Sequence, residues 1–301
     1  MQRRSFLRNT GLTLAGLSLL NKQTLASFLE DPAWKIRMLT DDIGIFTEKG
    51  GTIAFLLTKK GIVVVDAQFP DTAAHLIEEL KKKNKKPFKY LINTHHHGDH
   101  TGGNIAFKGL AEHVVAHKNS KANQLRVAAE QKLSADKFHI PDITFGEEGW
   151  TTKVNKETIM AHYSGAGHTN GDAMIHFQKA NIVHMGDLVF NRRHPYIDKT
   201  AGADIANWII LLDKAIATFD AKTQFICGHA AAGYDVVVKA TDLKAFGDYL
   251  GNVLKFTESE IRLGKTKEEI LKAKEIPGSP EWKGDGIERP LAAAYAELAV
   301  K

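Results

Sequence analysis

Four residues within one short stretch of the chain could together bind a metal ion. They are His95, His97, Asp99 and His100, which fit the pattern H-x-H-x-D-H. Imidazole nitrogens and carboxylate oxygens are the donors that Zn²⁺ and similar ions prefer. The side chains of residues 95, 97 and 99 share one side of an extended segment, and Gly98 permits a bend that turns Asp99 and His100 toward a neighbouring point. The stretch therefore predicts a metal site.

Three further metal-binding side chains each lie beside a glycine where a predicted strand ends. They are His168 in Gly165-Ala166-Gly167-His168-Thr169, Asp187 in Met185-Gly186-Asp187, and His229 in Cys227-Gly228-His229. A lone histidine at such a position is more often a hydrogen-bonded loop residue than a metal ligand. With the first four residues, however, the set reaches five histidines and two aspartates, which suffice for two metal ions. The glycines let the backbone approach a site closely.

These motifs resemble those of the metallo-β-lactamase superfamily of metallohydrolases. The resemblance rests on Asp66 at the end of Val63-Val64-Val65-Asp66, on the cluster at residues 95–100, and on His168, Asp187 and His229. It spans residues 66–229, and the order of the predicted strands agrees with it from about residue 34 to about residue 265. The H-x-H-x-D-H motif with its downstream partners is specific for the superfamily, although it does not identify a substrate.

The resemblance implies a role for each of these residues. His95, His97 and His168 would hold a first zinc ion, and Asp99, His100 and His229 would hold a second. Asp187 would bridge the two ions, a water or hydroxide between them would be the nucleophile, and Asp99 and His229 are also expected to be catalytic. Asp66 would orient the cluster loop through hydrogen bonds rather than bind metal. The implied fold is an αβ/βα sandwich of two mixed sheets with outer helices, and the site lies at one edge between the sheets.

Such a site would need no protein nucleophile. A bound metal ion lowers the pKa of water from 15.7 to about 7, and a second ion can polarise a carbonyl or phosphoryl oxygen. Cys227 has no activating base near it in the sequence, so we interpret it as a packing residue. As the chain has one cysteine, no internal disulfide is expected.

The pattern of apolar residues predicts the elements that position these side chains. Strands are expected at residues 34–40, 43–47, 52–58, 61–66, 90–94, 114–116, 158–163, 173–178, 181–185 and 224–227, and helices at residues 71–83, 121–133, 205–219 and 243–263. The first four strands read as an antiparallel meander. Residues 140–150 are expected to be a loop at the rim of a pocket. Two strand-rich halves, each followed by helices, predict two packed sheets with helices outside.

The loop after the strand of Asp187 is a candidate substrate-binding segment. Because it directly follows that strand, Asn191, Arg193 and Tyr196 are expected to contact the substrate, and a surface turn is an equally good interpretation. His184, which lies just before Gly186, is expected to support the site or to be merely buried.

The first 26 residues predict an export signal. The run Arg3-Arg4-Ser5-Phe6-Leu7-Arg8 before a mildly apolar stretch resembles a twin-arginine signal, which exports folded proteins. Residues 27–301 are then the metallo-β-lactamase-fold domain with a C-terminal helical extension. Export machinery is an expected partner, and the product is expected to be periplasmic or secreted in a bacterium, with no stable membrane association after removal of the signal.

Charge and composition argue against a nucleic-acid partner. The formal net charge is +5, and the lysines at residues 81–86 lie at the end of a predicted helix, where cations suit the helix dipole. No aromatic residues alternate with them, as would be typical of a single-strand binding surface. A small-molecule substrate is expected instead.

These features favour an exported zinc-dependent hydrolase with two ions per chain, acting on an ester, lactone, thioester or β-lactam-like substrate. In the resemblance, Asp187 is typical of hydrolases of lactones, thioesters and phosphodiesters, whereas the zinc-cysteine β-lactamases have a cysteine there. A mononuclear iron persulfide dioxygenase is an alternative, because such relatives keep much of the motif. A zinc-binding protein without catalysis is a third interpretation.

Overall fold

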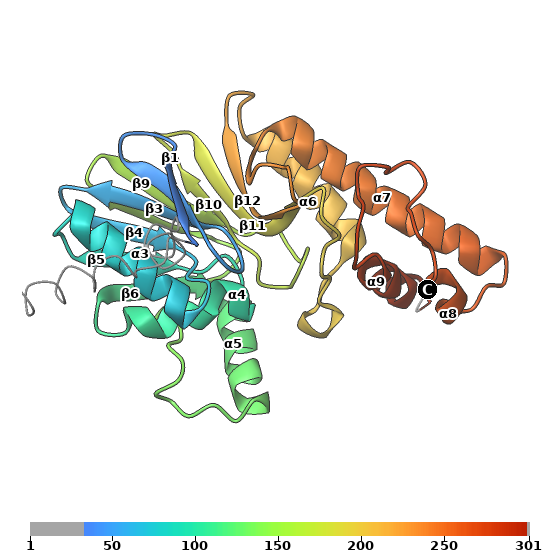
Figure 1. Ribbon diagram of the computed structural model, residues 1–301, viewed down its shortest axis with the longest axis horizontal. Coiled ribbons are helices and arrows are strands. Elements are labelled where there is room, and N and C mark those ends of the chain that lie inside the picture. The colour runs from blue at the N-terminus through green and yellow to red at the C-terminus, as the bar shows by residue number, and fades with distance from the viewer. Residues whose placement is uncertain (1–32, 300–301) are drawn as a thin grey trace, which may run out of the picture. The chain divides into compact units, whose positions relative to one another are not determined.

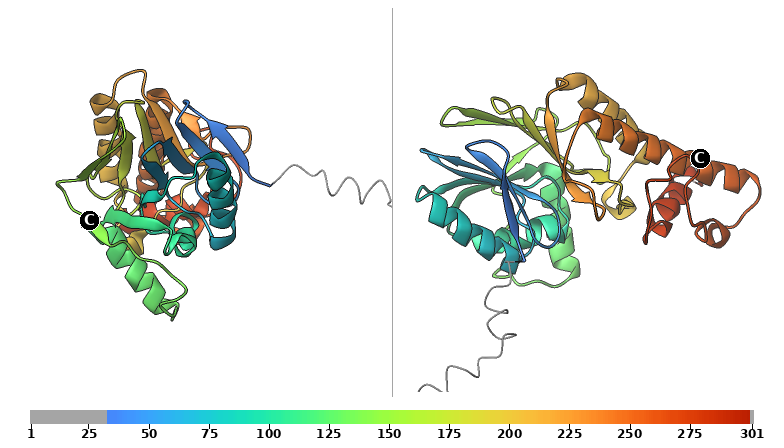
Figure 2. Two further views of the ribbon diagram at one scale, coloured as in Figure 1. Left: turned by 90° about the vertical axis from the view of Figure 1, so that its left-hand side faces the viewer. Right: turned by 45° about the horizontal axis from the view of Figure 1, so that its top comes forward.

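The structure, a computed structural model, describes residues 33–299, which from residue 36 onward form one compact unit. The predicted signal peptide at residues 1–26 lies outside the described residues. Two mixed β-sheets face each other, and helices cover their outer faces (Figure 1, Figure 2). The predicted αβ/βα sandwich is confirmed.

The first sheet has seven strands whose order in space follows their order in the chain. They are β1 (Lys35–Met38), β2 (Ile43–Thr47), β3 (Ile53–Thr58), β4 (Gly61–Val65), β5 (Phe88–Ile92), β6 (Ala111–His117) and β7 (Ile143–Phe145). Strand pairs are antiparallel from β2 to β4, as in the predicted meander, and parallel from β4 to β7. β4, with the sequence GIVVV, is buried along its whole length, as is typical of a strand covered on both faces.

The second sheet has six strands in the order β13-β12-β11-β10-β9-β8. They are β8 (Trp150–Val154), β9 (Glu157–His162), β10 (Met174–Phe177), β11 (Ile182–Asn191), β12 (Gln224–Ala230) and β13 (Val237–Val238). Only β11 and β12 pair in parallel. The parallel pairs of both sheets end at the same edge of the sandwich, where Asp66, His95 and His229 lie.

The helices are α3 (Pro70–Lys83), α4 (Gly98–Thr101), α5 (Lys118–Glu130), α6 (Ile205–Thr218), α7 (Ala240–Arg262), α8 (Lys267–Ile270) and α9 (Glu288–Leu298), with 3₁₀ turns η1 (Gly102–Phe107) and η2 (Lys199–Ala201). Helices α3 and α5 lie on the side of the first sheet and α6 and α7 on the side of the second, while α9 packs against α7, and α8 packs against α9 (Figure 1, Figure 2). None of the helices within residues 33–299 combines the length and the apolarity that a membrane span requires.

Two apolar cores hold these layers together. One lies between the sheets and includes Val65 and Val115 from the first sheet and Ile159 and Phe177 from the second. The other lies between the second sheet and α6, α7 and α9, with Trp208 fully buried at its centre. Because burial of apolar surface contributes roughly 25 cal/mol per Å², both cores stabilise the edge that carries the metal-binding side chains.

Several element boundaries differ from the sequence-based expectation in ways that concern the site. β11 continues through Asp187 to Asn191 instead of ending at residue 185, and β12 continues through His229. β5 ends at Ile92, so His95 lies in a loop. Residues 140–150 were expected to form a loop at a pocket rim, but they contain β7, the parallel edge strand of the first sheet. Parallel pairing with β6 makes this short apolar segment a strand, which its turn-rich neighbours hide in the sequence.

Candidate metal centre

The loop with the H-x-H-x-D-H motif follows β5 and is tied to the end of β4. Asp66, which has a positive φ of 65°, accepts a hydrogen bond from the backbone N–H of Thr94 at 2.8 Å through one carboxylate oxygen. Its other oxygen accepts from the Thr94 hydroxyl and from Nδ1 of His100, both at 2.8 Å. α4 then begins at Gly98, so the motif is divided between an extended part and a helical turn. Asp66 is thus placed to orient the loop, as the sequence predicts.

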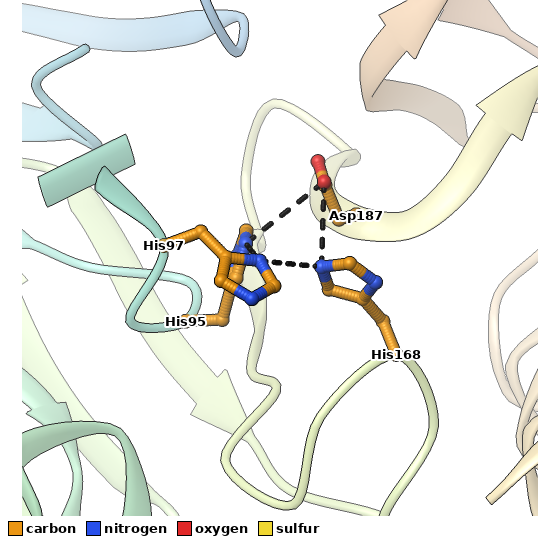
Figure 3. Close-up of side chains that lie close together, drawn as sticks. All are labelled: His95, His97, His168 and Asp187. Atoms are coloured by element: carbon orange, nitrogen blue, oxygen red, sulfur yellow. Dashed lines mark hydrogen bonds and ion pairs between the residues drawn. The ribbon is translucent and has the colours of Figure 1, made fainter. Parts of the chain in front are cut away.

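Three imidazole nitrogens converge on one point (Figure 3). Nδ1 of His97 lies 3.1 Å from Nε2 of His95 and 2.8 Å from Nε2 of His168. The other nitrogen of His97 donates to Oδ2 of Asp198 at 2.9 Å, and Nδ1 of His168 donates to the carbonyl of Tyr196 at 2.8 Å. These hydrogen bonds place the ring protons outside, so the inner nitrogens present lone pairs to each other. Such a donor set fits a cation between the rings.

A second group of donors comes from the helical turn and from β12. Nε2 of His229 lies 3.1 Å from Oδ2 of Asp99, and Nε2 of His100 lies 3.8 Å from the same oxygen. The donor atoms of these three residues lie within 4.8 Å of one another, a spacing that one metal ion can span. Asp99 therefore belongs to a different group from His95 and His97, because the bend at Gly98 turns it away from them.

Asp187 lies between the two groups, and each of its oxygens faces one of them. Oδ2 lies 3.4 Å from Nε2 of His168 and 3.9 Å from Nε2 of His95 (Figure 3). Oδ1 lies 3.0 Å from Nε2 of His100 and 3.4 Å from Nε2 of His229. Oδ1 of Asp187 and Nε2 of His100 are both buried, and apart from the ion-pair contacts just given neither has a hydrogen-bond partner among the described residues. Buried polar atoms are rarely left without partners, so these two atoms also fit a metal ion.

The backbone of β11 is shaped to place Asp187 at this point. The pairing of β11 with β12 is irregular on both sides of Gly186, which has a φ of 52°. His184 stabilises the irregularity, because its Nδ1 accepts from the N–H of Gly186 at 3.0 Å and its Nε2 donates to the carbonyl of Thr52 at 2.9 Å. A side chain at Gly228 would overlap Oδ1 of Asp187. His184 thus supports the site and does not point into it.

Two histidines of the first group, His168 and His95, are held in the neutral form. Burial lowers the pKa of His168 to about 3, and the neighbouring His97 adds to this effect. Burial also holds the pKa of His95 well below its ordinary value, with His100 as the next cause. Neutral imidazoles are the form that binds metal.

The histidines of the second group behave in the opposite way in the metal-free protein. Burial disfavours the charged form of His229, but Asp187 and Asp99 outweigh burial and raise its pKa to about 9. Asp187 and Asp66 likewise raise the pKa of His100 well above its ordinary value, against burial. For Asp187 itself, the charges of His229 and His100 overcome burial and hold its pKa well below the ordinary range.

A cavity of about 340 Å³ opens above these groups. Its lining includes ligand candidates from both groups, the aromatic residues Phe190 and Tyr196, and the two arginines Arg193 and Arg289. Of the three predicted substrate contacts, Arg193 and Tyr196 line the cavity. Asn191 does not, because its amide group donates to the carbonyl of Asp235 at 2.7 Å. Residues 140–150 do not line this cavity either.

Two carboxylates that the sequence interpretation did not single out support the site. Asp198 accepts from His97, and Nε2 of His96 lies 3.6 Å from the same oxygen. Asp172 accepts from the backbone N–H and the hydroxyl of Thr169, at 2.8 and 2.6 Å, and so shapes the loop of His168. Asp172 lies four residues after His168 in a glycine-rich turn, which is a usable signal, whereas nothing near Asp198 connects it with His97.

The chain is similar to several known proteins. A family model described as the Metallo-beta-lactamase superfamily matches residues 47–229. A type 2 metallo-beta-lactamase of Elizabethkingia meningoseptica is 23% identical over 227 residues, which cover 72% of this chain and 84% of the relative. A hydroxyacylglutathione hydrolase of Pelagibacter ubique is 27% identical over 177 residues, which cover 58% of this chain and 65% of that relative.

A solved structure shares the fold. It is a metallo-beta-lactamase from Pontibacter korlensis, and the match has a TM-score of 0.61 at 21% sequence identity. The match covers 73% of this chain and 99% of that structure. At this level of identity, the likeness concerns the fold.

Proposed function

Because the chain belongs to the metallo-beta-lactamase superfamily, we propose that it is a hydrolase with two zinc ions that cleaves a small ester, lactone, thioester or β-lactam-like molecule. The observation that carries this proposal is the position of Asp187. Its two oxygens face two separate groups of three metal-binding side chains. A carboxylate placed in this way can hold two cations at once and offset part of their repulsion, which an imidazole cannot do.

Different residues of the site would have different roles in hydrolysis. When bound, the ions supply Lewis acidity and lower the pKa of a water molecule from 15.7 to about 7. His97 and His168 are each held by a hydrogen bond on the outer nitrogen, so their inner nitrogens keep a constant direction. Asp99 lines the cavity, and its low pKa keeps it ionised, so it is placed to accept a proton at the reacting centre. Phe190 and Tyr196 line the same cavity with aromatic surface.

Metal content and turnover test the proposal on one preparation of the full chain. Protein purified without added metal is analysed for zinc and iron and then assayed against a panel of esters, lactones, thioesters and β-lactams. We expect about two zinc ions per chain and hydrolysis of at least one class. His113→Asn is the control for the loss of a histidine outside the metal centre, because His113 is half exposed and pairs with Asp142 away from the site.

Three outcomes would contradict the proposal in different ways. One iron ion per chain would favour the sulfur dioxygenase. Two zinc ions without any turnover would favour a zinc-binding protein. One zinc ion with full turnover would remove the role proposed for Asp187.

We further propose that the protein is exported through the twin-arginine pathway to the periplasm or beyond. The proposal rests on Arg3 and Arg4 before an apolar stretch that is poor in charges. Replacing both by lysine keeps the charge, so only specific recognition of the arginine pair would be lost. Cell fractionation should then find the protein in the cytoplasm, and an unchanged amount in the periplasm would refute the assignment.

A further inference from the structure

One end of the first sheet carries a cluster of lysines far from the metal centre. β4 and β5 both begin at this end and run toward Asp66 and the histidine loop, so a strand length separates the cluster from the metal-binding side chains. We propose that this cluster docks the protein reversibly on a membrane surface of anionic phospholipids, with the metal-site cavity at the other end of the sheet. The cluster, called the lysine face below, consists of Lys59, Lys60, Lys81, Lys83, Lys85 and Lys86.

Two segments that are distant in the sequence form the lysine face. The turn between β3 and β4 holds two of its lysines, and the end of α3 with the segment before β5 holds the other four. The side-chain amide of Asn84 donates to the carbonyl of Thr58 at 3.0 Å, and the N–H of Ile62 donates to the carbonyl of Pro87 at 2.9 Å. These hydrogen bonds hold the two segments side by side, so all six charges share one surface.

The lysines of this face have no partners within residues 33–299. All six are exposed, and none forms an ion pair or a side-chain hydrogen bond there. Their neighbours differ, because Lys82 pairs with Glu78 and Glu79 at 2.9 Å and Lys89 pairs with Glu112 at 2.7 Å. The helix dipole accounts for the two members of the face in the last turn of α3, but not for the four outside the helix.

The excess of positive charge is confined to the lysine face. The same end of the sandwich continues onto the second sheet, where Lys156 and Lys179 line a small cavity. The lining of this cavity also includes three carboxylates, those of Asp41, Asp42 and Glu157. The second sheet therefore adds no net positive charge here. The formal net charge of the whole sequence is +5, so six unpaired lysines at one end exceed the excess of the entire chain.

An exposed apolar side chain lies beside the lysine face. Leu110 is 37% exposed and directly precedes β6, whose Ala111 pairs with Phe88 at the start of β5. Leu110 is therefore next to the segment that carries Lys85 and Lys86. This combination fits the surface of a bilayer, where ammonium groups meet lipid phosphates and an apolar side chain enters the boundary with the acyl chains.

The residue types of the face favour a lipid surface over a nucleic acid. All six are lysines, which act as point charges, whereas arginine is the residue that recognises individual phosphates through two parallel hydrogen bonds. The face contains no aromatic side chain on which a base could stack, and the nearby Phe88 is buried. Near an anionic membrane, each lysine strengthens binding about fivefold, and salt screens this attraction.

Sedimentation of the full chain with lipid vesicles tests the proposal. The vesicles consist of phosphatidylcholine alone or of phosphatidylcholine mixed with phosphatidylglycerol, and a DNA duplex at the same phosphate concentration is the competing polyanion. We expect the protein to bind the vesicles that contain phosphatidylglycerol, to leave them at high salt, and not to bind the neutral vesicles. Binding to the DNA duplex should be weaker than binding to the anionic vesicles.

Variants identify the surface responsible. Lys85→Gln with Lys86→Gln removes two charges from the face and should weaken binding to the anionic vesicles about 25-fold. Lys272→Gln with Lys274→Gln is the matched control, because it removes two exposed lysines from the segment after α8, away from α3 (Figure 1), and should leave binding unchanged. Leu110→Ser should weaken binding to the vesicles severalfold without affecting the weaker binding to DNA.

The first residues of the chain need a control of their own, because Arg3 and Arg4 precede an apolar stretch that is present in every variant. Arg3→Gln with Arg4→Gln should leave vesicle binding unchanged, and a loss as large as that of the lysine pair would overturn the proposal. Equal binding by the lysine pair variant and its control, binding to neutral vesicles, no binding to anionic vesicles, or tighter binding to DNA would overturn it as well.

Discussion

The two metal-binding groups share Asp187 but differ in the charges and the burial that control the protonation of their histidines. The first group, His95, His97 and His168, consists of imidazoles, and burial holds His95 and His168 in the neutral form. In the second group, Asp99, His100 and His229, neighbouring carboxylates raise the pKa values of both histidines. The metal-free protein therefore presents lone pairs at His95 and His168, while protons occupy His100 and His229.

This difference follows from where the carboxylates lie. Oδ1 of Asp187 lies 3.0 to 3.4 Å from the two histidines of the second group. Its Oδ2 lies 3.4 to 3.9 Å from two of the three histidines of the first group. Asp66 and Asp99 add further negative charge beside the second group, whereas the first group has Asp198 at the outer nitrogen of His97. A metal ion entering the first group thus competes with little, and one entering the second must displace protons. We infer that the first group fills before the second.

Removing the shared charge should have the largest effect. Asp187→Asn keeps the size of the side chain but takes away the anion between the groups. We expect the variant to fold, to keep the ion held by the first group, and to lose affinity at the second, with turnover falling by about 100-fold or more. Zinc stoichiometry and turnover are measured on the same preparation.

A control variant makes this result interpretable. Asp142→Asn removes a carboxylate that is half exposed and pairs with His113, so it should keep both ions and normal turnover. If Asp187→Asn also kept two tightly bound ions and near-normal turnover, the comparison of the two groups around a shared carboxylate would have to be abandoned.

The next largest effect should be a difference between the two groups in how their metal affinity depends on pH. With a pKa of about 9, His229 is protonated in the metal-free protein at neutral pH and must release its proton to bind metal. His100, whose pKa is also raised well above its ordinary value by Asp187 and Asp66, must release its proton as well, so the affinity of the second ion should rise at least about tenfold per pH unit between pH 6 and 8. With a pKa of about 3, His168 releases no proton in this range, so the affinity of the first ion should stay nearly constant. Competition with a chromophoric chelator measures both, and parallel pH dependences would contradict the comparison.

Loss of a supporting carboxylate should weaken one group selectively. Asp198→Asn leaves His97 without its charged partner, and substitutions of this kind typically cost about 10- to 100-fold in metal affinity. We expect that loss at the first ion only, because Asp198 makes no contact with Asp99, His100 or His229. Equal losses at both ions would show that the groups are not independent.

The smallest expected effect concerns a buried histidine outside both groups. His117 stacks on Tyr163 at 3.9 Å and forms the N-cap of α5, and burial and then the charge of Lys118 lower its pKa to about 4. In the unfolded chain His117 binds a proton near pH 6.5, while the folded protein binds it only near pH 4. Stability should therefore fall as the pH drops from 6.5 to 4, by at most about 3 kcal/mol from this residue.

Urea unfolding at pH 7 and pH 4.5 checks this expectation. His117→Asn keeps an acceptor at the N-cap but cannot take up a proton in this range. The variant should lose less stability than the wild type between the two pH values. An equal loss would show that burial alone does not hold His117 neutral, and would weaken the same explanation for the first group.

The sequence by itself identified the side chains of the candidate metal centre. Histidine and aspartate at fixed spacing, next to glycines and to the ends of apolar strands, identified all seven side chains that the structure brings together. Such signals can be read locally, because donor type and strand periodicity are properties of short segments. The two-sheet fold was predictable for the same reason.

Only the tertiary structure decided how these side chains are shared and supported. His97 and Asp198 are 101 residues apart, and their contact depends on how the loop after β11 returns over the motif. Arg289 enters the cavity because Glu297 attaches α9 to α6. The protonation of each group likewise depends on burial and on the distances between charges from separate segments. Distances of a few ångströms between distant segments follow from strand register and loop paths, which no local pattern encodes.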